Sequence, residues 1–162
     1  MIITPAVAAN LLALNAANET ETSPLTPATL QQLLTSSWHL GLAGTDGQYG
    51  FLIALDDISD HPGLNFQWFK ARLARFVYID RVIVSAAVRG QGIARTLYDE
   101  LFRRAAAEGL PMIGCEINNL PPNPASDAFH ARLGFAEIGR AALPCGEKRV
   151  RYLGRSTADW LA

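Results

Sequence analysis

The first 69 residues of this 162-residue chain contain no lysine and no arginine. All fourteen basic side chains lie at Lys70 or later, together with nine acidic ones, whereas the first 69 residues carry six acidic side chains. The net charge of -1 therefore conceals an acidic first part and a basic second part. Twelve of the bases are arginine, whose planar guanidinium suits phosphate and carboxylate partners. The pattern predicts an anionic partner for residues 70–162, with an accident of composition as the alternative.

The sequence also lacks a membrane span, a secretory signal and a cysteine pattern for disulfides or zinc. No apolar run reaches the ~18–20 residues that cross a bilayer, so no membrane span is expected. The N-terminus has no basic segment of the kind that opens a secretory signal. The two cysteines, Cys115 and Cys145, have neither the number of a disulfide framework nor the spacing of a zinc site. We therefore expect a cytoplasmic protein without a bound metal.

The length of the chain fits one domain over residues 1–162. Apolar residues make up 49% of it and charged residues 18%, so it can bury a core, and global disorder is excluded. Within this domain, residues 1–69 form the acidic N-terminal part and residues 70–162 the basic part.

Periodicity and turn signals predict a mixed α/β fold with the order β-α-α-β-β-β-α-β-α-β-β. Residues 58–76 form a long aromatic connection, and the strand–helix–strand after it implies a parallel strand pair around the helix. The predicted strands span residues 1–4, 38–43, 49–55, 76–85, 112–118, 135–142 and 148–153. The predicted helices span residues 7–18, 27–34, 93–108 and 124–133.

The segment Arg89–Ala94, with the sequence Arg-Gly-Gln-Gly-Ile-Ala, lies between a predicted strand and a predicted helix. Glycine there lets the backbone approach a ligand, and the free N–H groups of a helix start attract phosphate. The segment lacks the lysine of a P-loop and the three-glycine dinucleotide fingerprint, which disfavours ATP hydrolysis and NAD binding. Together with Leu133-Gly134-Phe135 after a short helix, it resembles the GNAT superfamily of N-acetyltransferases.

This resemblance implies a GNAT-like fold and acetyl-CoA as the acyl donor. The backbone of the glycine segment would hold the pyrophosphate, and a strand edge would pair with the pantetheine amides and polarise the thioester carbonyl. Asn123 and Ser126 fall on a family pattern that contacts the cofactor arm. The residues expected to bind acetyl-CoA or CoA are Ile83, Val84, Arg89, Gly90, Gln91, Gly92, Ile93, Ala94, Arg95, Thr96, Asn123 and Ser126.

His130 stands where that family pattern usually has the tyrosine that protonates the departing CoA thiolate. A free histidine titrates near ~6.5 and a thiol near ~8.5, so this exchange is chemically workable. Such a histidine needs a neighbouring anion or a water to act as an acid at pH 7. The alternative is a histidine that packs on its helix and bonds to a carbonyl.

Two carboxylates inside apolar runs, Glu116 and Asp80, are candidates for the base that accepts the ammonium proton. Glu116 is preferred, because Asp80 precedes Arg81 and is the better candidate for a structural ion pair. Simple alternation places Asp80, Val82 and Val84 on one face of their strand. A chain of water molecules without a dedicated base is also compatible with the sequence.

Trp68 and Phe69, in the aromatic connection, are candidates for an acceptor-binding pocket. They are equally suited to plug one end of the core. His39, within a strand, is expected to be structural, and Cys115 to be an inert small hydrophobe.

The sequence thus predicts acetyl transfer from acetyl-CoA to a primary amine of a small molecule, by direct attack with both substrates bound. The alternatives are a protein N-terminal or lysine acetyltransferase and a non-catalytic CoA-binding regulator. Nucleic-acid binding is disfavoured because acids are interspersed among the bases. The expected partners are acetyl-CoA and an amine, with no membrane, and a homodimer is compatible with the sequence. The acidic first part favours an amine that arrives as a cation.

Overall fold

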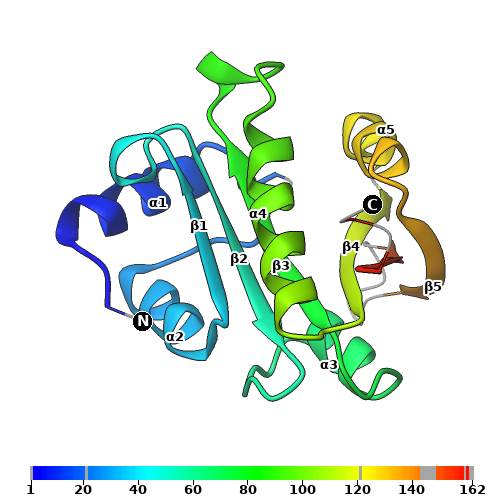
Figure 1. Ribbon diagram of the computed structural model, residues 1–162. Helices are drawn as coiled ribbons and strands as arrows, with labels where there is room; N and C mark the ends of the chain where they lie inside the picture. The colour runs from blue at the N-terminus through cyan, green and yellow to red at the C-terminus, as the bar shows by residue number, and fades with distance from the viewer. Residues whose placement is uncertain (1, 21, 121, 143–148, 159, 161–162) are drawn as a thin grey trace.

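A computed structural model describes residues 2–20, 22–120, 122–142, 149–158 and 160, and it is a mixed α/β fold (Figure 1). One mixed sheet has the strand order β1-β2-β3-β4-β6-β5. The strands are β1 (His39–Ala43), β2 (Gly50–Asp56), β3 (Val77–Val84), β4 (Met112–Leu120), β5 (Ala136–Ala142) and β6 (Arg149–Ser156). The helices are α1 (Pro5–Ala16), α2 (Pro27–Ser36), α3 (Leu64–Lys70), α4 (Ile93–Ala107) and α5 (Pro124–Arg132). Two 3-10 turns, η1 (Thr45–Gly47) and η2 (Ala86–Val88), connect them.

Three helices begin at a capping side chain that is followed by proline. The side chains of Thr4, Thr26 and Asn123 each accept a backbone N–H of the first turn of α1, α2 and α5. The predicted strand at residues 1–4 is wrong for residues 2–4, which form no strand. Thr4 is extended, but its side chain caps α1 instead of extending a sheet.

The helices cover the sheet in two layers. One face packs against α4 and α5, through side chains that include Leu97, Leu101 and Leu133. The other face packs against α1, α2 and α3, through side chains that include Leu11 and Leu34. In Figure 1, α4 runs along the sheet beside β3, whereas α5 lies over the part of the fold formed by β4 and β5.

Helix α3 occupies the connection that the sequence leaves without secondary structure. Its N-cap, Gly63, offers no side-chain hydrogen bond, so the usual start signal is missing. Phe66 and Phe69 are fully buried, and burial of this aromatic face stabilises the short helix. Gly114 of β4 leaves room for the Phe69 ring, because a Cβ at residue 114 would lie 2.2 Å from that ring.

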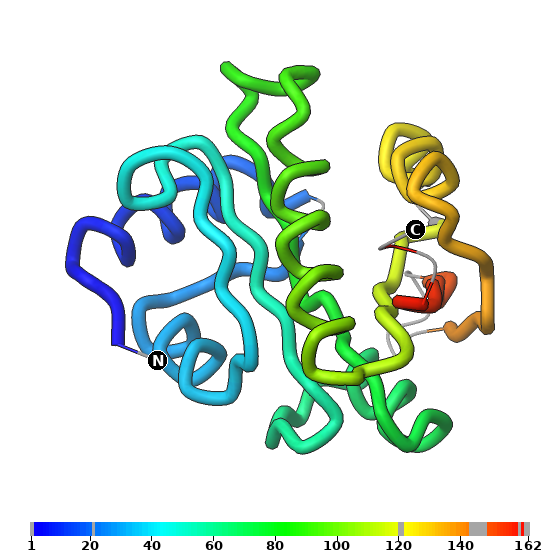
Figure 2. Tube along the Cα trace, in the orientation of Figure 1, coloured from blue at the N-terminus to red at the C-terminus, as the bar shows by residue number. Residues whose placement is uncertain are grey.

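The predicted parallel pair on either side of α4 is present, but it is short. Strands β3 and β4 pair only where Val77 faces Ile113 and Tyr78 faces Gly114. Beyond these residues the two strands diverge, and Figure 2 shows the chain from β4 onward separating from β3. Among the described residues, one edge of β3 from Ile79 to Val84 therefore carries no neighbouring strand.

A β-bulge in β3 corrects the predicted alternation around Asp80. Strand β2 pairs Ala54 with Ile79 and Ile53 with Arg81, which leaves Asp80 as an extra residue. Ile83 consequently joins the core on the α1 side, whereas Val82 packs toward α4. The predicted grouping of Asp80 with Val82 is therefore wrong, and the bulge turns Asp80 and Arg81 toward the same region.

The closing hairpin is confirmed, since β5 and β6 pair antiparallel, while its predicted turn at residues 144–146 lies outside the described residues. Cys115 is buried and free, and Cys145 also lies outside them. Within the described ranges, no helix has the length and apolar character to span a membrane. The same residues contain no group of three or more side chains arranged to hold a metal ion.

Candidate active site

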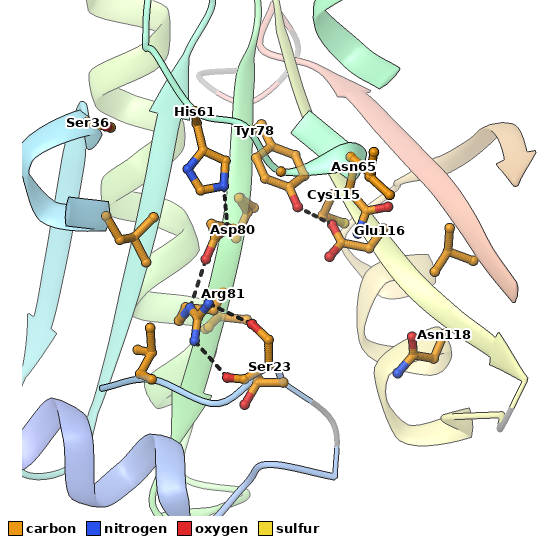
Figure 3. Close-up of a pocket in the computed structure, with 18 of the residues that line it drawn as sticks. Ser23, Ser36, His61, Asn65, Tyr78, Asp80, Arg81, Cys115, Glu116 and Asn118 are labelled. Atoms are coloured by element: carbon orange, nitrogen blue, oxygen red, sulfur yellow. Dashed lines mark hydrogen bonds and ion pairs between the residues drawn. The ribbon is translucent and has the colours of Figure 1, made fainter. Parts of the chain in front are cut away.

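A cavity of about 830 Å³ opens where β3 and β4 diverge (Figure 3). Its size falls within the ~300–1,000 Å³ typical of small-molecule sites. It is walled by β3, β4, α2, α5, the segment before α2 and the loop before α3. The predicted site residues among its lining are Asp80, Glu116, Asn123, Ser126 and His130. Asp80 and Glu116 face one cavity from two strands, which the sequence could not establish.

Glu116 on β4 is held by side chains from two other elements. The Tyr78 hydroxyl on β3 donates to Glu116 Oε2 at 2.6 Å, and the nearby Asn65 side chain of α3 acts to lower the pKa of this carboxyl. The Tyr152 hydroxyl in turn donates to Asn65 Oδ1 at 3.0 Å. Burial raises the pKa of Glu116 to about 7, and the charge of Asp80 adds to the rise, while the Tyr78 hydrogen bond opposes it. Near neutral pH this carboxyl can therefore both accept and return a proton.

Asp80 belongs to an ion pair on the opposite wall. Its Oδ2 lies 2.8 Å from Arg81 Nε, and both side chains are largely buried. Arg81 also donates to Asn15 Oδ1 at 2.7 Å and to the carbonyl and hydroxyl oxygens of Ser23. This pair ties the segment between α1 and α2, which lines the cavity, to the bulge in β3.

His61, in the loop before α3, leans over Asp80 at the same wall (Figure 3). Its Nε2 lies 3.7 Å from Asp80 Oδ1. The ring fits only because residue 63 is glycine, since a Cβ there would lie 2.6 Å from His61 Nε2. The Gln67 side chain donates to the His61 carbonyl at 2.6 Å, which fixes the loop from α3.

His130 is buried against α4, and both of its ring nitrogens have partners. Nδ1 lies 2.8 Å from the Ser126 carbonyl, which can only accept, so Nδ1 carries the hydrogen. Nε2, 2.8 Å from the Tyr98 hydroxyl, is then the acceptor of that hydroxyl's proton. Burial lowers the pKa of His130, which keeps it neutral at pH 7. This geometry favours the packing alternative over the acid that the resemblance implies.

Replacing His130 by phenylalanine is therefore expected to lower the free energy of unfolding and to leave kcat nearly unchanged. The Tyr98 hydroxyl would lose its partner in the core, at a cost of ~1–3 kcal/mol. Adding Tyr98→Phe removes the unpaired hydroxyl, and we expect the double variant to recover part of this loss. Urea unfolding and steady-state kinetics test this expectation. A fall in kcat of ~100-fold or more with unchanged CoA affinity would instead assign the acid role to His130.

The glycine segment forms an open backbone turn before α4. Gly90 and Gly92 have φ of 79° and 80°, and a Cβ at either position would meet no atom of the described residues within 4 Å. Among the described residues, no hydrogen bond uses the N–H groups of Gly92, Ile93, Ala94 or Arg95. Free donors, the positive end of the α4 dipole and open space fit a phosphate group.

The other residues predicted to bind the donor surround this turn. The Arg89 guanidinium donates to Asn18 Oδ1, Arg95 pairs with Asp99 at 2.9 Å, and the Thr96 hydroxyl donates to the Gly92 carbonyl. Ile83 and Val84 lie on the unpaired edge of β3. In a strand with a partner on one side only, alternate backbone groups face the open side, as pairing to an extended ligand requires.

Trp68 and Phe69 do not line the cavity. Trp68 stacks on Tyr152 with ring centroids 4.0 Å apart, and Phe69 is fully buried under Gly114. These positions favour the core-plug alternative. The aromatic segment still serves the site indirectly, because α3 carries Asn65 to Glu116.

Tyr78, Asn65 and His61 line the site but could not be recognised as site residues from the sequence alone. Tyr78 lies two residues before Asp80 in an apolar strand, where a tyrosine is indistinguishable from core. Asn65 and His61 belong to a connection singled out only for its aromatic residues. The sequence does contain one signal, which is the presence of polar side chains within that aromatic stretch. This signal indicates a local function but does not predict which residues they contact.

Comparisons with known proteins identify relatives of this fold. The model of the Acetyltransferase (GNAT) family matches residues 18–135. A solved ribosomal-protein-alanine N-acetyltransferase from Brucella melitensis is similar in fold, with 22% identity, TM-score 0.70, and coverage of 96% of this chain and 98% of that one. No curated protein sequence matches the chain.

Two further solved structures have lower identity and a similar fold. A putative GNAT acetyltransferase from Desulfovibrio desulfuricans has TM-score 0.74 and 13% identity, covering 97% of this chain and 96% of that one. An aminoglycoside 6'-N-acetyltransferase complexed with coenzyme A has TM-score 0.68 and 13% identity, and the alignment covers 95% of this chain and 92% of that one. At these identities the structures establish a shared fold.

Proposed function

The chain belongs to the GNAT family of acetyltransferases, and we propose that it transfers the acetyl group of acetyl-CoA to the primary amine of a small, cationic molecule. The observation that carries this proposal is the half-buried carboxyl of Glu116, whose desolvation raises its pKa to about 7, in a cavity beside the open edge of β3. The amine attacks the thioester directly, with both substrates bound.

The residues around the α4 start fit the donor. The free N–H groups from Gly92 to Arg95 would hold the pyrophosphate, with Arg89 and Arg95 adding positive charge. The open edge at Ile83 and Val84 would bond to the amides of the pantetheine arm and orient the thioester. A backbone N–H there would stabilise the negative charge that develops on the carbonyl oxygen.

The cavity walls fit a cationic acceptor. Asp80 and Glu116 place two carboxyl groups on it, and Asp60 contributes a third at an exposed position. Glu116 accepts a proton from the attacking nitrogen as the N–C bond forms and the C–S bond breaks. The CoA thiolate then takes up this proton, because a thiol has a pKa near ~8.5, above that of Glu116.

A panel of amines with detection of free CoA thiol tests the proposal. The expected result is thiol release that depends on a small primary amine, with N-acetylated amine as the product. Faster turnover of peptides would favour a protein N-terminal or lysine acetyltransferase. Tight CoA binding without turnover of any amine or peptide would contradict the enzymatic proposal and favour a regulatory CoA-binding protein.

A further inference from the structure

We propose that His61, paired with Asp80, is a second catalytic base that removes the first proton from the acceptor's ammonium group and passes it to solvent. This inference rests on the proposed acetyl transfer and assigns a residue to one of its steps. An amine that arrives as R–NH₃⁺ must lose one proton before it can attack and a second one afterward. A single carboxyl at Glu116 cannot hold both protons at the same time, and a second base removes the need to reset it between the two steps.

The geometry keeps an imidazole at the cavity wall. Gly63 leaves room for the ring, and the Gln67 side chain holds the His61 carbonyl, so the loop is anchored to α3. The ring packs edge-on against Phe66, with centroids 5.8 Å apart. His61 is thus restrained on one side by α3 and faces Asp80 on the other.

His61 differs from the other two histidines of the chain in its exposure to solvent. Its side chain is 21% exposed, whereas His39 and His130 are buried. A group that exports protons needs contact with both the cavity and the solvent, and His61 alone among the three lines the cavity with part of its ring exposed. The carboxyl of Glu116 lines the cavity from β4 and accepts the Tyr78 hydroxyl.

The charges around His61 come from several elements. On β3, Asp80 faces the ring and is itself paired with Arg81, and Asp60 precedes His61 in the loop. On α3, the Lys70 ammonium lies 5.5 Å from the Phe66 ring centroid and donates to the Ser59 carbonyl. On β4, Glu116 lines the far wall of the cavity. Asp80 lies against the ring, with its Oδ1 3.7 Å from His61 Nε2.

In the proposed reaction His61 removes the first proton of the amine and Glu116 the second. R–NH₃⁺ gives one proton to an imidazole nitrogen of His61, forming R–NH₂ and an imidazolium beside the Asp80 carboxylate. The imidazolium releases that proton to solvent. The lone pair of R–NH₂ forms the N–C bond, the C–S bond breaks, and the second proton passes through Glu116 to the CoA thiolate. Both bases return to their starting states.

Amines of different basicity test this division. At pH 7.5 about a quarter of an α-amine with a pKa near ~8 is neutral, against about one in a thousand of an alkylamine with a pKa near ~10.4. Glycinamide and propylamine serve as the two probes. We expect His61→Gln to lower kcat/KM ~100-fold for propylamine and less than ~10-fold for glycinamide. His39→Gln, outside the cavity, should affect both amines equally.

Rescue by added imidazole gives a second readout. His61→Ala leaves a space over Gly63, so imidazole should restore propylamine turnover at least ~10-fold. His61→Gln fills that space, so no restoration is expected there, and a merely structural histidine would show rescue in neither variant. Equal losses for both amines, or no rescue of His61→Ala, would overturn the relay while leaving acetyl transfer intact. Failure of the unmodified protein to acetylate either amine or any panel member would instead overturn the proposed function, and the relay with it.

Discussion

Replacing Glu116 by glutamine is expected to lower kcat by ~100- to 10,000-fold, because the variant removes the proton acceptor without changing the shape of the side chain. The Tyr78 hydroxyl can still bond to the amide, so the cavity should persist. The matched control is Glu100→Gln on α4, where the side chain is 52% exposed and outside the cavity lining. Steady-state kinetics with a turned-over amine measure both. Activity of Glu116→Gln within ~10-fold of the unmodified protein would exclude Glu116 as the base.

The pH dependence of the same reaction follows from the pKa of Glu116. Only the ionised carboxylate accepts a proton, so kcat should rise with pH through an inflection near the pKa of about 7 and then level off. Removing the Tyr78 hydrogen bond with Tyr78→Phe withdraws a contact that lowers this pKa, and the inflection should move to higher pH. An inflection that stays fixed in Tyr78→Phe would contradict the assignment.

Stability should change with pH in the opposite sense. The folded protein binds the Glu116 proton more tightly than the unfolded chain does, so the neutral carboxyl favours folding. This contribution is complete below the ordinary glutamate pKa near ~4.3 and is lost as pH rises through about 7. Glu116→Gln cannot ionise, so its free energy of unfolding relative to the unmodified protein should increase between pH 5 and pH 8. Urea titrations at both pH values measure the difference.

The local parts of this structure are readable from sequence, whereas the contacts that make the site are not. Gly92 before α4 and Asn123 before α5 follow from short-range rules, because a glycine turn or a cap needs only its neighbours in the chain. The bulge at Asp80 could not be predicted, since β-forming residues flank Asp80-Arg81 on both sides and the sequence reads as one strand. Which residues share a face therefore depends on pairing with β2, which a single strand's sequence does not specify.

Helix α3, which carries Asn65, could not be predicted from the sequence either. Residues 64–70 lack a capping side chain, and seven residues are too few for propensity to identify a helix. This helix is stabilised by burying Phe66 and Phe69, and the room for Phe69 comes from Gly114, which lies 45 positions later in the chain. Asn65 reaches Glu116 only as a consequence of that packing. The network around the base is thus a product of tertiary contacts.

Replacing Gly92 by valine is expected to abolish the stabilisation of the protein by acetyl-CoA. Gly92 has φ of 80°, which a β-branched residue adopts only with strain, and its Cβ position is open space in front of the α4 N–H groups. A side chain there would occupy the volume proposed for the pyrophosphate and tilt the turn that presents the donors. We expect the Kd for acetyl-CoA to rise ~100-fold or more.

Thermal shifts measure this loss, with a control from the other end of the same helix. A ligand at ~100 times its Kd stabilises a protein by ~2.7 kcal/mol, and each kcal/mol moves Tm by ~2–4 °C in a chain of this size. Gly109→Val imposes similar strain at φ of 68°, where the nearest atom to a Cβ is Arg75 Nη1 at 3.9 Å. It should lower the basal Tm comparably while keeping the shift with acetyl-CoA. An undiminished shift in Gly92→Val, or its loss in both variants, would contradict a phosphate site at the start of α4.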